Sequence, residues 1–153
     1  GNAGGIGPRF ERRFREPIWD AATRKQIYTP GRGATSISSC AAEGTYHWLT
    51  EEDGRSVPAI RLSDCTTNGG WRLPSLRRSD VETDITVRCY ASTGTPTLTA
   101  EGGGTGSQTS VLATGWNTVS LTLTAANMAP DGNGDFIKLS GSNIYFTEAV
   151  VDQ

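Results

Sequence analysis

Apolar and polar residues alternate through most of the chain, with the period of two that marks a β-strand buried on one face. The alternation is cleanest in residues 85–89 and 119–123, and Ile144, Phe146 and Val150 extend it near the C-terminus. The pattern predicts strands over Thr35–Ala42, Thr45–Leu49, Pro58–Ser63, Val81–Ala91, Thr95–Glu101, Thr109–Thr114, Asn117–Thr124, Phe136–Leu139 and Asn143–Val151.

Turn-forming residues separate these stretches and indicate antiparallel connections. The turns are rich in glycine, asparagine or aspartate and lie at 52–54, 68–70, 102–104, 131–134 and 141–143. Eight or nine short strands in roughly 120 residues predict an all-β fold, an antiparallel β-sandwich of jelly-roll type.

The first part of the chain has a different pattern, and we expect residues 1–33 to form an extended N-terminal arm joined to a β-domain of residues 34–153. Its start is rich in glycine, and the proline-bounded stretch 9–16 carries two phenylalanines at the spacing of one helix face. Asp20 is a candidate N-cap for a second helical piece that ends before Pro30. Both pieces are too short to be stable alone, so the arm needs a surface to lie on.

The arm is basic, whereas the rest of the chain is acidic. Seven Lys or Arg against three Asp or Glu give residues 1–32 a formal charge of +4, which leaves −6 for the remaining residues because the whole chain carries −2. Such asymmetry indicates an arm that lies on another macromolecule. We therefore expect partner binding by Arg9, Phe10, Arg12, Arg13, Phe14, Arg15, Ile18, Trp19, Arg24, Lys25, Ile27 and Tyr28. The alternative is that these side chains pack back onto the chain's own β-domain.

The composition agrees with a turn-rich β-domain that has a modest core, since 35% of the residues are hydrophobic and 19 are glycine. No stretch approaches the roughly 18 apolar residues that a membrane-spanning helix needs, so we expect no membrane association. The three cysteines, Cys40, Cys65 and Cys89, lack the density of a disulfide framework and the close pairing of a zinc site. We expect three reduced and mostly buried thiols, with one disulfide and one free thiol as the alternative.

The sequence offers little catalytic chemistry, and we expect no catalytic residues and no enzyme activity. His47 is the only histidine, no G-x-S-x-G motif is present, and a lone histidine beside Trp48 on a strand favours a structural role. The carboxylates at 51–53 directly precede a glycine and predict a solvated hairpin turn, whereas a glycosidase would need two carboxylates across a cleft. The glycine-rich residues 102–106 lack the Gly-Lys-Ser/Thr ending of a phosphate loop and predict a flexible loop.

Asp131, Asn133 and Asp135 are spaced like the opening of a calcium loop. Phe136 and Ser142 stand where such a loop needs a glycine and a bidentate glutamate. We expect a plain turn without metal, and no cofactor anywhere in the chain, with calcium at this turn as the alternative.

Four aromatic residues, Trp48, Trp71, Tyr46 and Tyr90, are candidates for a platform on which a sugar ring stacks. Trp71 is the strongest of them, because the preceding Asn-Gly-Gly predicts a loop and Arg72 stands beside it. The alternative for Trp71 is a core or interface aromatic.

A second basic cluster, Arg72, Arg77 and Arg78, precedes a run of acidic residues. Such clustered opposite charges are typical of an intersubunit contact or of a solvated rim. Nucleic-acid binding is disfavoured, because acidic residues interrupt the basic arm and the pI is about 5.4.

The C-terminal stretch GWNTVSLTLTAANM, followed by DFIKLSGSNIYFTEAVV, resembles the last strands of galactose-binding-like jelly rolls over residues 115–151. In that family a Gly-Trp-Asn entry leads an alternating strand, and the domain closes on a strand of the form x-I-x-F-x-E-x-x-V. The resemblance implies a jelly-roll fold and leaves the ligand open.

A basic arm joined to a compact β-domain resembles the architecture of cement, or decoration, proteins of tailed-bacteriophage capsids. The resemblance implies a body, often trimeric, on the capsid surface and an arm that staples neighbouring subunits. We therefore expect a structural virion protein, made in the host cytoplasm, that forms a homo-oligomer and binds the major capsid protein or another virion protein. The main alternative is a carbohydrate-binding or adhesin module of a phage tail or similar assembly, and a small enzyme is a weaker one.

Overall fold

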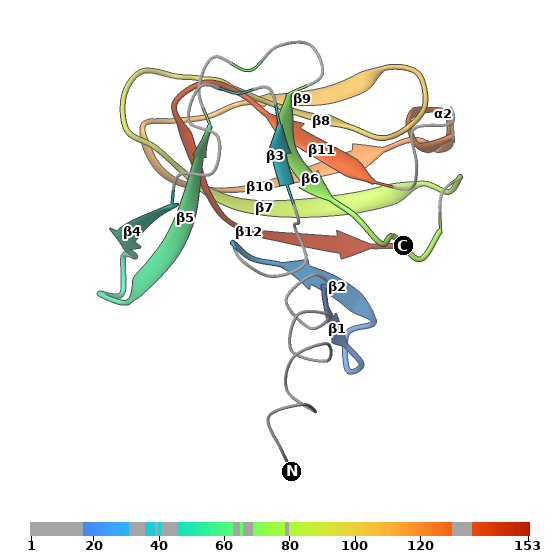
Figure 1. Cartoon of the computed structure of the whole chain (residues 1–153), viewed down its shortest axis with the longest axis horizontal. Coiled ribbons are helices and arrows are strands. Elements are labelled where there is room, and N and C mark those ends of the chain that lie inside the picture. Colours follow the sequence, from blue (N-terminus) through green and yellow to red (C-terminus); the bar gives the residue numbers. More distant parts are fainter. Residues whose placement is uncertain are drawn as a thin grey trace, which may run out of the picture.

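The computed structural model describes residues 17–30, 36–38, 40, 46–62, 65, 69–78, 80–129 and 136–153. These residues form two antiparallel sheets packed face to face, together with one short helix (Figure 1). The predicted all-β sandwich is confirmed, and each of the nine predicted stretches overlaps an observed strand. Within the described residues, no helix has the length and apolar character needed to cross a membrane.

The seven-stranded sheet consists of β1 (Ile18–Asp20), β2 (Lys25–Tyr28), β4 (Tyr46–Thr50), β5 (Ser56–Leu62), β7 (Thr83–Ala91), β10 (Gly115–Leu123) and β12 (Ile144–Asp152). It is organised around β12. One edge of β12 pairs with β7, which pairs in turn with β10. The other edge pairs with β5 at the start of β12 and with β2 at its end. β4 pairs with β5, and β1 pairs with β2. The β4–β5 and β1–β2 hairpins therefore form two branches of the sheet along the same edge of β12.

The five-stranded sheet has the order β3 (Ser36–Ser38), β6 (Gly70–Leu73), β11 (Ile137–Ser140), β8 (Thr97–Glu101) and β9 (Ser107–Val111). The helix α2 (Ala125–Met128) follows β10 and begins with a capping box, in which the Thr124 side chain and the Asn127 side chain each bond the other's backbone. Backbone N–H groups of Gly104 and Thr105 donate to carbonyls of α2, so the predicted flexible glycine loop is held against this helix.

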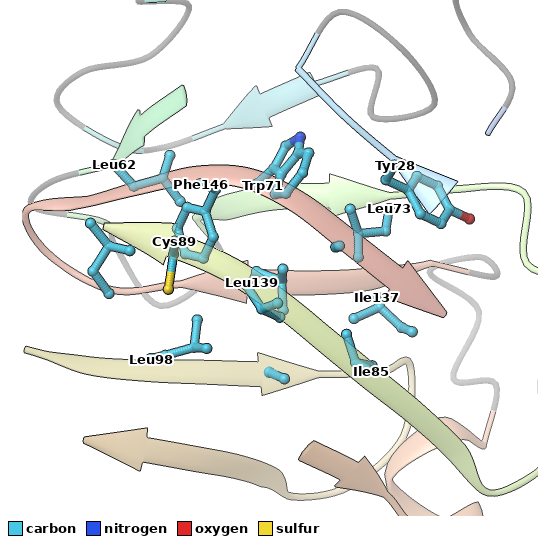
Figure 2. Close-up of a cluster of buried hydrophobic side chains, with 14 of the residues drawn as sticks. Tyr28, Leu62, Trp71, Leu73, Ile85, Cys89, Leu98, Ile137, Leu139 and Phe146 are labelled. Atoms are coloured by element: carbon cyan, nitrogen blue, oxygen red, sulfur yellow. The ribbon is translucent and has the colours of Figure 1, made fainter. Parts of the chain in front are cut away.

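The core lies between the two sheets and is filled by the inward residues of the alternating strands (Figure 2). Ile85, Val87 and Cys89 of β7 have no exposed surface, in agreement with the sequence pattern. From the other sheet, Trp71 packs against Phe146 of β12, with ring centroids 5.8 Å apart. This burial is the main favourable contribution to folding.

The predicted second helical piece is wrong, because residues 18–28 form the β1–β2 hairpin. The Asp20 carboxylate does accept N–H groups as an N-cap would, from Ala22 at 3.0 Å and Thr23 at 3.4 Å, but here it closes a tight turn. Arg24 then adopts a positive φ of 60°, which ends any helical course. Because β2 pairs with β12, the described part of the predicted arm contributes to the body's own sheet. The first helical piece lies outside the described residues.

Two further features depart from the sequence pattern. The stretch read as a loop before Trp71 leads directly into β6, where Gly70 is needed because a Cβ there would lie 2.6 Å from the Leu139 carbonyl oxygen. In β12, the register against β7 shifts between Phe146 and Glu148. This bulge places Val151 in the core, whereas the sequence pattern places Val150 there.

The prediction of three reduced cysteines is wrong, and its alternative holds. Cys40 and Cys65 form a disulfide, and Cys89 is a free, buried thiol. The two bonded cysteines are separated by 25 residues, and only the return of the chain through β4 and β5 brings them together. Burial raises the pKa of the Cys89 thiol to about 12.

Candidate functional site

A polar cleft of about 660 Å³ lies between the β4–β5 hairpin and the outer face of the seven-stranded sheet. The hairpin contributes residues 51–53, 55, 57 and 58, and the sheet contributes Thr86 and Arg88 of β7, Thr118 of β10 and Glu148 of β12. These sheet positions alternate with the buried ones, so the pattern that builds the core also lines the cleft. The volume falls within the range of about 300–1,000 Å³ that is usual for ligand sites.

The hairpin turn itself is fixed by short backbone bonds. The Glu51 N–H donates to the Arg55 carbonyl at 2.7 Å, and the Gly54 N–H donates to the Glu51 carbonyl at 2.9 Å. Gly54 has φ +88°, which suits glycine. Asp53 accepts the backbone N–H and the guanidinium of Arg55, and these bonds hold the pKa of its carboxyl below the usual range.

Arg88 organises the floor of the cleft. Its Nη2 lies 2.7 Å from a carboxylate oxygen of Glu51 and 2.7 Å from one of Glu52, and its Nη1 donates to Thr118 at 3.1 Å. The Glu51 side chain is only 10% exposed, so the predicted solvated turn is correct for Glu52, at 73%, and wrong for Glu51. Bonding to Glu51 raises the pKa of Arg88, so the guanidinium stays charged at every ordinary pH. Arg88 thus holds Glu51, Glu52 and Thr118 in one bonded group on the floor of the cleft.

A row of aromatic rings crosses the same outer face, from His47 on β4 to Trp116 on β10. Ring centroids are 5.2 Å apart for His47 and Tyr145, 6.2 Å for Tyr145 and Tyr90, and 5.2 Å for Tyr90 and Trp116. The pairing register produces the row, because Tyr145 and Trp116 both lie opposite Tyr90. The Arg88 guanidinium stands 4.7 Å from the Trp116 ring, which joins the row to the cleft. The expected structural role of His47 stays a prediction.

Trp48 is the most exposed large apolar side chain among the described residues, at 71%. In the β4–β5 pairing it lies across from Pro58, which is one of the residues that line the cleft. Trp48 itself is not among the residues that line the cleft, and it points to the opposite face of the hairpin from His47 and its ring partner Tyr145. Sequence reasoning named Trp48 as an aromatic candidate but did not rank it first, because alternation alone does not say which face of a hairpin is exposed.

The prediction that Trp71 is a sugar platform is wrong. Trp71 is fully buried, and β6 directs Trp71 and Leu73 into the core while Arg72 between them lies on the other side. The Arg72 guanidinium stands 4.8 Å from the Phe136 ring. A ring with no exposed surface cannot stack on a ligand, so the alternative of a core aromatic holds.

The predicted arm residues have different environments where the structure describes them. Tyr28 is fully buried, and its hydroxyl donates to the Pro74 carbonyl, so for this residue the alternative of packing onto the body holds. Trp19 is 41% exposed and the Arg77 guanidinium lies 4.1 Å from its ring. Half-buried Ile18, Lys25 and Ile27 lie in the hairpin strands, and Arg24 and Arg78 are exposed. Arg9, Phe10, Arg12, Arg13, Phe14 and Arg15 lie outside the described residues.

No cluster of three or more potential metal ligands occurs in the part of the chain that the structure describes. The candidate calcium turn, Asp131, Asn133 and Asp135, lies outside that part. The expectation of a plain turn without metal therefore stays a prediction.

No family model matches the sequence. No curated protein matches it either. Among solved structures, an exo-β-1,3-galactanase from Phanerochaete chrysosporium is similar over 84% of this chain and 29% of its own, with 10% identity and a TM-score of 0.50. A carbohydrate-binding module from Cellvibrio mixtus lichenase 5A is similar over 77% and 94%, with 18% identity and a TM-score of 0.46. The vertex protein P5 of PRD1 is similar over 84% and 71%, with 16% identity and a TM-score of 0.41. These similarities show the fold alone, a β-sandwich.

Proposed function

We propose that this chain is a carbohydrate-binding β-sandwich module, and that a sugar lies along the β4–β5 hairpin with one ring stacked on Trp48. The observation that carries the proposal is an indole, 71% exposed, on the β4–β5 hairpin that forms one wall of the cleft. Tryptophan is enriched at binding surfaces, because its indole combines a large apolar face with an N–H donor.

The chemistry of the cleft suits a pyranose ring. Such a ring has a face of C–H groups, which packs on an indole, and a rim of hydroxyls, which need donors and acceptors. The cleft supplies carboxylates from Glu52 and Glu148, the guanidinium of Arg88 and the hydroxyl of Thr86. Hydrogen bonds that involve charged groups are about twice as strong as neutral ones, so a few of them can fix the orientation of a sugar.

We propose binding without hydrolysis. Among the described residues that line the cleft, Glu51 and Glu52 are ion-paired to Arg88 and Asp53 is ion-paired to Arg55. Glu148 is then the one carboxylate of this lining without an ion pair, whereas a glycosidase uses two carboxylates across a cleft. The module would therefore hold a glycan and leave its glycosidic bonds intact.

A glycan array of plant, algal, bacterial and animal oligosaccharides tests the proposal, followed by titration calorimetry with the strongest ligand. We expect Trp48→Ala to weaken binding at least tenfold, about 1.4 kcal/mol, because the stacking surface is lost. Trp19→Ala removes an exposed indole outside the β4–β5 hairpin. It is the matched control and should bind the sugar as the wild type does. A wild-type array without any specific ligand, or equal binding by Trp48→Ala, would contradict the proposal. Release of reducing ends from the bound oligosaccharide would contradict its non-catalytic part.

A second candidate function is a cement protein on a virion surface, in which residues 1–16 and the exposed Trp19 dock on the major capsid protein or another virion protein. The observation that favours it is the exposed Trp19, which belongs to the predicted arm and contacts Arg77 of the predicted intersubunit cluster. Particle binding by the full chain and by a chain that lacks residues 1–16 distinguishes the two candidates. Under this proposal the truncation abolishes attachment, whereas Trp48→Ala leaves it intact; a trimer in sedimentation would agree with the assembly that we expect.

A further inference from the structure

We propose that the β1–β2 hairpin and the segment after β6 form a second binding surface, which docks an acidic segment of a protein partner. We name it the Trp19 groove and define it by Trp19, Arg24, Gln26, Arg77 and Arg78. The proposal is independent of sugar binding at the hairpin β4–β5, because none of these five residues lines that cleft.

The geometry of the groove provides an anchor for a partner. Trp19 and Arg77 together separate two adjoining hollows, one of about 320 Å³ towards Arg24 and Arg78 and one of about 440 Å³ towards Pro17. The Arg77 guanidinium lies 4.1 Å from the Trp19 ring centroid, a cation–π contact that leaves the indole 41% exposed. Tryptophan and arginine are the residue types most enriched among the energetically dominant residues of protein interfaces.

The groove is also fixed in place. The Gln26 amide donates to the Ser75 carbonyl at 2.8 Å, which ties β2 to the segment that carries both arginines. On the other side, the Gln153 side chain bonds both the N–H and the carbonyl of Arg78, at 3.1 and 2.8 Å. A partner would therefore meet a backbone that is already ordered, which lowers the entropic cost of association.

The charge of the groove indicates what the partner carries. Arg24, Arg77 and Arg78 all face the groove, against a single carboxylate, Asp152. None of these three guanidinium groups forms an ion pair with any residue in the described ranges. Unpaired guanidinium groups beside an exposed indole fit an acidic peptide segment that also offers an apolar side chain.

Fluorescence anisotropy with the full chain tests the inference. The probe is a fluorescein-labelled dodecapeptide in which Glu and Asp alternate with Tyr and Pro, and the control peptide replaces every Glu and Asp by Gln and Asn. We expect saturable binding of the acidic peptide only. Binding should weaken at least tenfold in Arg77→Glu and in Arg78→Glu, because the new carboxylate repels the carboxylates of the peptide. It should also weaken at least threefold when NaCl rises from about 50 to about 300 mM, since the groove is exposed and salt screens it.

Arg55→Ala is the matched control, because it removes an exposed guanidinium from the β4–β5 turn and should leave peptide binding unchanged. Circular dichroism of each variant establishes that it is folded, and Trp19→Ala gives a second loss-of-binding variant without charge reversal. Two results would overturn the inference. One is equal binding of the neutral peptide. The other is no saturable binding of the acidic peptide up to about 1 mM, since a Kd of that size corresponds to a binding free energy of only about −4 kcal/mol. Tighter binding of a single-stranded oligonucleotide with the same sensitivity to Arg77→Glu would also overturn it and assign the groove to nucleic acid. Because Trp48→Ala affects only the sugar site, failure of either proposal is distinguishable from failure of the other.

Discussion

Replacing Tyr28 by alanine is expected to destabilise the whole β-sandwich, although this residue lies in the segment that the sequence assigns to an arm. Tyr28 is fully buried in the core, and its hydroxyl donates to the Pro74 carbonyl across 46 residues of sequence. Its neighbours on β2 pair with β12, the strand that organises the seven-stranded sheet. Removing the ring therefore opens a cavity in the body and breaks a long-range bond at the same time.

The magnitude follows from these two contacts. Truncation of a buried aromatic ring to alanine costs about 3–5 kcal/mol, and a lost hydrogen bond costs about 0.5–1.5 kcal/mol. Because the strand lies near the end of the sheet and its surroundings can partly relax, we expect about 4 kcal/mol for Tyr28→Ala. Tyr28→Phe keeps the ring and should cost about 1 kcal/mol. Trp19→Ala, on the exposed strand of the same hairpin, should cost about 1 kcal/mol or less.

Urea unfolding followed by tryptophan fluorescence measures all three variants by linear extrapolation. The corresponding fall in melting temperature for Tyr28→Ala is about 8–16 °C in a chain of this size. A loss of less than about 1 kcal/mol for Tyr28→Ala, or a loss equal to that of Trp19→Ala, would refute the reasoning, because β2 would then not belong to the cooperative unit. A slope m much smaller than that of the wild type would instead indicate that the hairpin unfolds on its own.

Three further predictions concern the interior and its connections. Reduction of the Cys40–Cys65 disulfide should lower the unfolding free energy by about 3 kcal/mol, from the 25-residue separation, and equal urea midpoints with and without reductant would disprove this. Cys89 should resist a thiol reagent in the native state at pH 8 and react once the chain is unfolded. The pKa of the Cys89 thiol is raised from 9.0 to about 12, so the unfolded chain loses this proton at a lower pH than the folded chain. Between pH 9 and 10 the free energy of unfolding should therefore fall by about 1 kcal/mol more in the wild type than in Cys89→Ala. Parallel pH profiles of the two proteins would contradict the prediction. Gly104→Ala should cost about 1–3 kcal/mol, because the new Cβ would lie 2.1 Å from the Ala126 carbonyl oxygen, and an unchanged melting temperature would rule this out.

The period-two pattern predicted the sandwich well, because burial on one face imposes the same alternation on every long strand. The pattern failed where contacts between residues far apart in the sequence determine the local structure. Asp20 offers the same side-chain oxygen to a helix and to a tight turn, and only the pairing of β2 with β12 decides between them. The glycines before Trp71 looked like a turn, whereas Gly70 is small because the backbone of β11 passes close to it. Both decisions depend on residues far away in the sequence.

The candidate cleft was harder to predict than the fold. Arg88 and Glu51 are 37 residues apart, and no local pattern shows that the β4–β5 turn lies over β7. One signal was present: a long charged side chain at an outward position of a core strand usually has a partner nearby. The choice between Trp48 and Trp71 could not be made from the sequence, since both stand beside turn residues and polar neighbours. The structure separates them by burial, with Trp48 71% exposed and Trp71 fully buried.

The two proposed binding surfaces are separated along β12, which explains how one small domain could hold two different partners. The start of β12 pairs with β5, and Tyr145 there belongs to the aromatic row beside the cleft. The end of β12 pairs with β2, and Asp152 there lines the Trp19 groove. The bulge between Phe146 and Glu148 lies between these two halves. Because the described residues of the two surfaces share no side chain, substitutions in Trp48 and Arg77 should be additive within about 0.5 kcal/mol for either ligand. The β-sandwich would then act as a rigid connector that holds a glycan at one branch of β12 and a protein at the other.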